Sequence, residues 1–82
     1  MSLRELARRL EDEGISPHAI SIDGSMRDET YCLVETPAAW ESFYYERGQR
    51  RDLVQFEVFV DAAAHFLKRV LKDPTTRQVR PA

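Results

Sequence analysis

The sequence predicts an α+β domain, in which two helices pack on one face of a four-stranded antiparallel meander sheet. Apolar residues recur at helical spacing near both ends of the 82-residue chain, a spacing that gives each helix one apolar side. Between them lie four short runs of strand-forming residues separated by turn residues. The connections between these runs are short, which favours antiparallel neighbours in sequential order. We therefore expect the element order α-β-β-β-β-α.

The first helix is expected over residues 3–13. Ser2 and Glu5 fit a capping box, in which the serine accepts a backbone hydrogen bond at the helix start. The apolar stripe that follows consists of Leu3, Leu6, Ala7 and Leu10. Gly14 can take the left-handed conformation that ends a helix, and Ile15 is placed to touch Leu10, as in a Schellman motif.

Four strands are expected between the helices, at residues 19–22, 30–35, 40–46 and 52–59. The first two are separated by a polar loop, and Pro37 marks the turn after the second, because proline cannot donate to a sheet ladder. Gly48 is free to take a positive φ in the hairpin connection that follows the third strand. Along the fourth strand, one face is expected to present apolar side chains to the core, namely Val54, Phe56 and Val58.

The second helix is expected to begin with Asp61 as its N-cap and to end at Asp73-Pro74. Its apolar stripe consists of Ala63, Phe66, Leu67, Val70 and Leu71. We expect a single domain over residues 1–74. Residues 75–82 have no apolar pattern, and they are expected to form a flexible C-terminal tail.

The charge is unevenly distributed along the chain. Residues 1–67 hold 13 acidic and 7 basic side chains, whereas residues 68–82 hold 5 basic side chains and 1 acidic one. The acidic balance of residues 1–67 argues against nucleic-acid binding, because such binding needs a basic face. The same balance suits a basic protein partner. No apolar stretch has the length of a membrane span or the form of an export signal. We therefore expect no membrane association and a cytoplasmic location.

The residue types that build catalytic or metal sites are sparse. Cys32 is the only cysteine, and it lies in a predicted strand, where a small buried side chain is the ordinary interpretation. His18 and His65 lack further ligands at metal-binding spacing. There is no nucleophile elbow, phosphate-binding loop or dinucleotide fingerprint. We expect no catalytic residues, no metal and no cofactor, and the chain is predicted not to be an enzyme.

Aromatic residues are concentrated in the third predicted strand. Alternation places Trp40 and Tyr44 on one face and Phe43 and Tyr45 on the other. If helices cover only one face, some of these rings are exposed, and exposed aromatics mixed with charges have the composition of a protein interface. The same pattern also fits ordinary cross-strand pairs. The residues predicted to bind a partner are Asp28, Glu29, Glu41, Phe43, Tyr45 and Arg47.

The chain resembles the small immunity proteins of bacterial polymorphic toxin systems, over roughly residues 3–72. The resemblance lies in a helix and Gly-Ile turn followed by a series of characteristic residues: Tyr31-Cys32-Leu33, Trp40, Tyr44, Glu46-Arg47-Gly48, Phe59 and a closing helix that ends in Leu71. Ser42 departs from the pattern, which has an aliphatic residue there.

This resemblance implies an immunity protein that neutralises a cognate toxin domain by occlusion. The toxins of such systems include NAD glycohydrolases and nucleases, and the family carries no catalytic residues of its own. The alternative function is a generic protein-interaction module or a homodimer with no toxin partner. Neither the toxin's identity nor the oligomeric state follows from the sequence.

Overall fold

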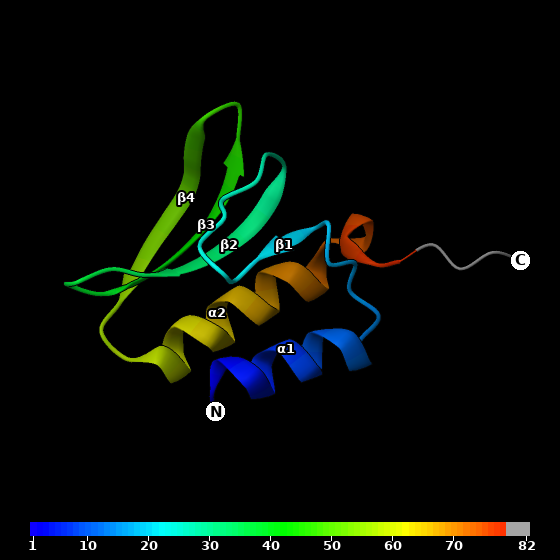
Figure 1. Cartoon of the computed structure of the whole chain (residues 1–82), viewed down its shortest axis with the longest axis horizontal. Coiled ribbons are helices and arrows are strands. Elements are labelled where there is room, and N and C mark those ends of the chain that lie inside the picture. Colours follow the sequence, from blue (N-terminus) through cyan, green and yellow to red (C-terminus); the bar gives the residue numbers. More distant parts are fainter. Residues whose placement is uncertain (79–82) are drawn as a thin grey trace, which may run out of the picture.

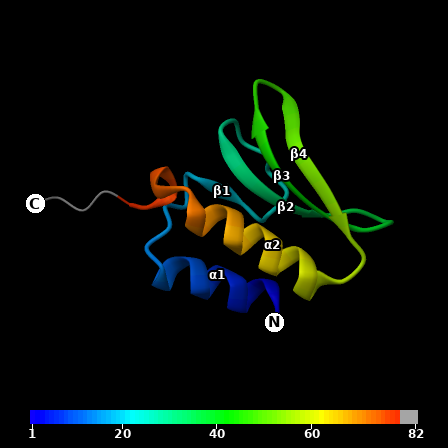
Figure 2. The same ribbon diagram turned by 180° about the vertical axis from the view of Figure 1, so that it is seen from behind.

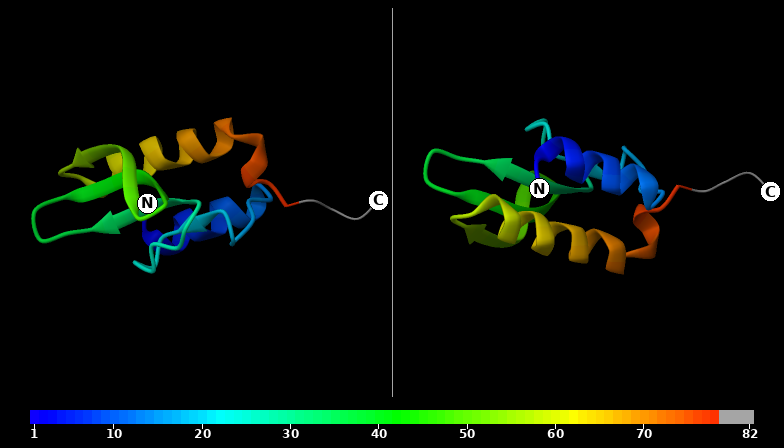
Figure 3. Two further views of the ribbon diagram at one scale, coloured as in Figure 1. Left: turned by 90° about the horizontal axis from the view of Figure 1, so that it is seen from above. Right: turned by 90° about the horizontal axis from the view of Figure 1, so that it is seen from below.

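The computed structural model describes residues 1–78 and has the α+β architecture that the sequence predicts (Figure 1). Its elements are α1 (Leu3–Asp12), β1 (Ile20–Ser21), β2 (Thr30–Glu35), β3 (Trp40–Glu46), β4 (Gln49–Phe56), α2 (Phe59–Lys72) and the 3₁₀ helix η1 (Pro74–Thr76). Both helices lie on one face of the sheet, and the views from behind and from below show them side by side (Figures 2 and 3). Of the two, α2 makes the contacts with β2, β3 and β4.

The sheet is mixed, so the expectation of a purely antiparallel meander is wrong at one edge. The strand order β1-β2-β3-β4 is sequential, but β1 runs parallel to β2, with Ile20 opposite Tyr31. A parallel pair needs a connection that carries the chain back to the start of the first strand. Because β1 is a two-residue strand, about 7 Å long, the loop of residues 22–29 is long enough to make that return.

The start and end of α1 are as the sequence predicts. Ser2 is the N-cap, and its hydroxyl accepts the Glu5 N–H at 3.2 Å. Gly14 has a φ of 74°. Its N–H donates to the Glu11 carbonyl at 2.9 Å, while the Ile15 N–H donates to the Leu10 carbonyl at 3.0 Å. These are the two bonds of a Schellman motif, which turns the chain from the helix toward β1.

The core lies between the helices and the sheet. It combines buried residues from both helices with one from β2 and one from the α1–β1 connection: Leu6, Leu10, Ile15, Leu33, Ala62, Ala63, Phe66 and Val70. Three aromatic pairs surround it, with ring centroids 4.8 Å apart for Tyr31–Tyr44 and Trp40–Phe59 and 5.2 Å apart for Phe56–His65. Such pairs stabilise a core beyond the burial of their surface alone.

The fourth strand and second helix begin earlier than predicted, at Gln49 and Phe59, and β4 contains a β-bulge. Ser42 pairs with Val54 but Tyr44 pairs with Arg51, so two residues of β4 lie opposite Phe43. One of the two is Asp52, which has a φ of 54°. The bulge changes the alternation of β4, which an unbroken pattern over residues 52–59 does not anticipate.

Two expected core residues are exposed, because Val54 lies on the edge strand and Val58 lies past the end of β4. Val54 is on the edge strand with 37% of its surface exposed, and Val58 is 54% exposed. Val58, and not Asp61, is the N-cap of α2, without a side-chain capping bond. By contrast, the predicted burial of Phe66 and Val70 is confirmed.

The packed part of the chain extends past residue 74. Thr76 is 2% exposed, and its hydroxyl donates to the Val70 carbonyl at 2.9 Å. The Ser16 N–H donates to the Thr76 carbonyl at 2.7 Å, and the Gln78 N–H donates to the Gly14 carbonyl at 2.8 Å. The C-terminal segment thus packs beside the Schellman turn as far as Gln78. For residues 79–82, the expectation of a flexible tail lies outside the described residues.

A polar contact links α2 to both β3 and the bulge. His65 Nδ1 lies 3.1 Å from the Ser42 hydroxyl, and His65 Nε2 lies 3.5 Å from Arg69 Nη2. Arg69 Nη2 also donates to the Asp52 carbonyl at 2.9 Å. Because a guanidinium can only donate, Nε2 of His65 accepts, and the neutral ring carries its proton on Nδ1. Burial lowers the pKa of His65, and the charges of Arg69 and Lys68 lower it further.

We predict that the protein loses stability as the pH falls below the ordinary histidine value. The folded pKa of His65 lies below 6.5, so the unfolded chain takes up a proton at a higher pH than the folded chain does. The stabilisation from neutral His65 is complete above about pH 6.5 and is lost as the pH falls through its folded pKa. Urea unfolding between about pH 7.5 and pH 5 measures this change.

The comparison uses two variants. His65→Gln is expected to flatten the pH dependence in this range, and His18→Gln, at an exposed position before β1, is the matched control substitution. An NMR titration in which the His65 ring titrates at or above 6.5 would contradict the assignment.

Candidate protein-binding surface

The six residues predicted to bind a partner separate into two groups. Asp28, Glu29, Tyr45 and Arg47 gather at one end of the sheet, where the loop before β2 meets the β3–β4 turn. The Asp28 carboxylate accepts the Arg47 backbone N–H at 2.7 Å, and Tyr45 pairs across the sheet with Thr30, next to Glu29. Glu41 and Phe43 are buried farther along β3.

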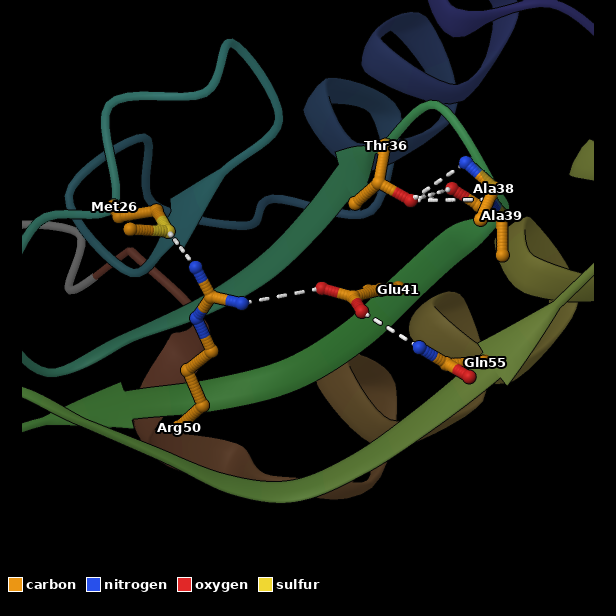
Figure 4. Close-up of polar contacts among 7 residues, drawn as sticks. All are labelled: Met26, Thr36, Ala38, Ala39, Glu41, Arg50 and Gln55. Atoms are coloured by element: carbon orange, nitrogen blue, oxygen red, sulfur yellow. Dashed lines mark hydrogen bonds and ion pairs between the residues drawn. The ribbon is translucent and has the colours of Figure 1, made fainter.

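Glu41 belongs to a polar cluster on the face of the sheet opposite the helices (Figure 4). The side chain of Arg50 donates to Glu41 Oε1 at 3.3 Å, and Gln55 Nε2 donates to Glu41 Oε2 at 2.9 Å. Glu41 is 7% exposed. Because both carboxylate oxygens are already bound within the chain, Glu41 organises this face and is not presented to a partner.

The expectation that Phe43 is exposed is wrong. The alternation of β3 does place it on the face away from the helices, but only 1% of its surface is exposed. The Arg50 guanidinium lies 5.3 Å from the centre of its ring, and another nitrogen of that group contacts the Met26 sulfur at 3.9 Å. The Arg50 side chain therefore lies over Phe43, on a face that the sequence leaves open, and it also contacts Met26 of the loop over residues 22–29.

The first group, together with Tyr44 and Glu46, forms the hairpin-end surface, which we define as Asp28, Glu29, Tyr44, Tyr45, Glu46 and Arg47. Because Tyr44 lies on the helix side of β3 and Tyr45 on the opposite side, this surface extends around the end of the sheet. The β3–β4 turn, at the top of Figure 1, projects away from the helices. Its two turn residues, Arg47 and Gly48, have φ values of 52° and 75°, as a tight type I′ hairpin requires. The hydrogen bond from the Arg47 backbone N–H to the Asp28 carboxylate fixes the loop to this turn, so the charged side chains are attached to an ordered backbone.

The hairpin-end surface is predominantly acidic. Asp28, Glu29 and Arg47 are exposed, and the two tyrosines and Glu46 are half-buried. Arg51 forms an ion pair with Glu46 at 2.6 Å. Burial raises the pKa of the Tyr44 hydroxyl, and the charges of nearby carboxylates raise it further, in the order Glu29, Glu46, Asp73 and Asp28.

A cleft of about 420 Å³ adjoins this surface. Tyr31 and Tyr44 form its aromatic wall, and Glu29, His18 and Asp73 are among the other residues that line it. The Tyr31 hydroxyl donates to Asp73 Oδ2 at 2.8 Å. Burial and this bond to a carboxylate raise the pKa of Tyr31 to about 12, so the hydroxyl stays a donor and holds the wall in place.

Asp73 is held by its own turn as well. Its Oδ1 accepts the Thr75 hydroxyl at 2.6 Å and the Thr75 N–H at 2.9 Å. These bonds, together with that from Tyr31, lower the pKa of the Asp73 carboxyl. Sequence reasoning took Asp73-Pro74 only as a helix stop and missed this cleft. The available signal was the alternation that places Tyr31 and Tyr44 on one face of neighbouring strands.

The arrangement is suited to recognition of another protein. A tyrosine ring beside a carboxylate can bind a cationic side chain in two ways at once. The ring face makes a cation–π contact, and the carboxylate makes a charge-assisted hydrogen bond. In residues 1–78 no three histidine, cysteine or acidic side chains are grouped so that they could hold a metal ion. Burial raises the pKa of the Cys32 thiol, which keeps it in its unreactive, protonated form.

Comparison with known proteins does not identify a relative. No family model matches the chain, and neither a curated protein nor a solved structure is significantly similar to it. Neither α1 nor α2, the α-helices of the described chain, has the length and apolar character needed to cross a membrane. The resemblance to immunity proteins therefore stays a prediction from sequence.

We predict that Phe43→Ala lowers the stability of the protein much more than Tyr45→Ala does. Removing the buried ring of Phe43 should lower the free energy of unfolding by about 3–5 kcal/mol. Removing the half-buried ring of Tyr45 should cost under about 1.5 kcal/mol and leave the fold intact. Urea unfolding with near-ultraviolet circular dichroism measures both. A loss below about 1 kcal/mol for Phe43→Ala would mean that this ring is accessible after all.

Proposed function

We propose that this chain is an immunity protein that binds a cognate toxin domain through the hairpin-end surface and occludes its active site. The observation that supports this most strongly is the hairpin-end surface itself. It brings exposed carboxylates and partly exposed tyrosines onto a rigid turn beside an aromatic cleft. Tyrosine and arginine are enriched among the residues that dominate protein interfaces.

The charge of the surface suits the proposed class of partner. NAD glycohydrolases and nucleases both bind phosphate-bearing substrates, which favours a basic substrate cleft. The exposed carboxylates of Asp28 and Glu29 complement such a cleft and can occupy it in place of the substrate. Charge attraction also accelerates encounter, which a producer cell needs if it is to silence the toxin before it acts. We place this encounter in the cytoplasm.

Rigidity is a second reason for choosing this surface. The Asp28 bond to the hairpin turn and the Tyr31 bond to Asp73 hold the loop, the sheet and the C-terminal turn together. A surface that is ordered before binding loses less conformational entropy when the complex forms. Tight stoichiometric inhibition depends on keeping that loss small.

The alternative is a homodimer that pairs through β4, and the exposed edge of that strand favours it. Leu53 and Val54 are 38% and 37% exposed. However, Arg50, Arg51 and Asp52 place charges along the first half of the strand, and the bulge interrupts its pairing edge. Charges and bulges are the features by which edge strands avoid such pairing. We therefore propose that the chain acts as a monomer, which sedimentation at increasing protein concentration tests.

The proposal predicts that a neighbouring gene encodes a large protein with a toxin domain, and co-expression with that domain tests binding. Wild-type protein should restore growth and copurify with the toxin. The variant Glu29→Gln/Tyr45→Ala should bind at least about tenfold more weakly, since central aromatic anchors typically contribute more than 1 kcal/mol. Isothermal titration calorimetry with the purified, catalytically inactivated toxin domain measures the affinity.

The control is Glu35→Gln/Val60→Ala, which removes one exposed carboxylate and trims one exposed apolar side chain elsewhere. It should bind like the wild type. Failure of the wild-type protein to restore growth would refute the immunity function. Undiminished affinity of Glu29→Gln/Tyr45→Ala would refute the hairpin-end surface as the interface.

A further inference from the structure

We propose that the chain has a second binding surface, a groove between α1 and β1 that takes an amphipathic helix with basic side chains. This α1–β1 groove has a volume of about 680 Å³. Its lining comes from α1, from the turn after it, from the β1 region and from the C-terminal segment: Ala7, Leu10, Glu11, Asp12, Ile15, Pro17, Ile20, Ile22 and Gln78. It is separate from the hairpin-end surface and does not depend on the function proposed above.

The floor of the groove is apolar and firmly supported. Leu10 and Ile15 are buried members of the main core, and Ile20 and Ile22 are half-buried and pack against that core. Half-buried isoleucines leave apolar surface in contact with water, and covering that surface is favourable. Because the floor is part of the core, an occupant binds to a preformed surface.

The rim of the groove is acidic. Glu11 and Asp12 are exposed at the C-terminal end of α1, where the helix dipole adds negative potential. In the described part of the chain, Glu13 takes the ion pairs with Arg9 and Arg77, and Glu11 and Asp12 form none. These two carboxylates favour an occupant that carries lysine or arginine beside its apolar residues.

The outer edge of β1 excludes the addition of a strand. Arg27 reaches back over this edge and donates through Nη2 to the Pro17 carbonyl at 2.9 Å and to the Ile20 carbonyl. A partner strand would have to displace these bonds to pair with β1. An occupant must therefore bind through its side chains, as an amphipathic helix does when apolar residues at i, i+3, i+4 and i+7 enter a groove.

The test uses a synthetic leucine–lysine peptide of about 15 residues that forms an amphipathic helix, with a leucine–glutamate peptide of the same pattern for comparison. Binding is followed by fluorescence anisotropy and by the NMR shifts of the Ile15, Ile20 and Ile22 methyl groups. We expect the lysine peptide to shift these methyls and the glutamate peptide to leave them unchanged.

Two matched variants locate the site. Ala7→Arg places a large cation in the wall of the groove at an exposed helical position, and Ala64→Arg makes the same change at an exposed position of α2. Ala7→Arg should weaken binding of the lysine peptide at least tenfold, and Ala64→Arg should not. Glu29→Gln/Tyr45→Ala should also bind the peptide normally, which separates this result from the outcome of the toxin experiment.

Three results would overturn the proposal. The first is the absence of methyl shifts with the lysine peptide, and the second is equal binding by Ala7→Arg and the wild type. The third is a change of the same methyl shifts with protein concentration when no peptide is present, which would assign the groove to a second copy of the chain.

Discussion

Phe66 and Val70 have no exposed surface, and the packing of α2 that buries them supports every other part of the molecule. Through these residues α2 contacts Leu33 of the sheet and the apolar side of α1. The same helix holds the β4 bulge through Arg69 and receives the C-terminal turn through the Thr76 hydroxyl. Because α2 makes all of these contacts, loss of its packing would release α1, the bulge and the cleft at once.

The second face of the sheet is closed by a different means. No helix of the described chain lies there; instead, the Arg50 side chain lies over the Phe43 ring and contacts the Met26 sulfur of the 22–29 loop, and Arg50 and Gln55 bind the Glu41 carboxylate. This closure takes two residues away from any interface and concentrates the accessible aromatic and acidic groups at the end of the β3–β4 hairpin. The fold thereby limits where a partner can bind, and the proposed function follows from that restriction.

Much of the fold could be predicted because it depends on local signals. Ser2, Gly14 and the apolar stripe specify α1 within a few neighbouring residues, and the ends of β2 and β3 follow from turn residues. The bulge at Asp52 depends on long-range pairing and on Arg69, seventeen residues away along the chain. The parallel pairing of β1 likewise depends on where the loop after it returns. The spacing of apolar residues along the sequence contains no information about long-range pairing or about the path of a loop.

The positions of the residues chosen as partner-binding could be predicted only in part, for a similar reason. Alternation along β3 correctly placed Phe43 and Tyr45 on the face away from the helices, but the Arg50 guanidinium, which comes from another strand, lies over the Phe43 ring. Asp28 and Arg47 were chosen separately, and the structure joins them by a hydrogen bond. The cleft formed by Tyr31, Tyr44 and Asp73 was missed because it needs residues from three separate segments.

The central claim is that a partner contacts this protein at the end of the β3–β4 hairpin. Amide hydrogen exchange on the free chain and on its complex with the toxin domain tests this most directly, since it reports each backbone segment separately. The account predicts new protection at residues 28–30 and 44–48, with little change in α2. Protection confined to the helices, or to the face that carries Glu41, would contradict it.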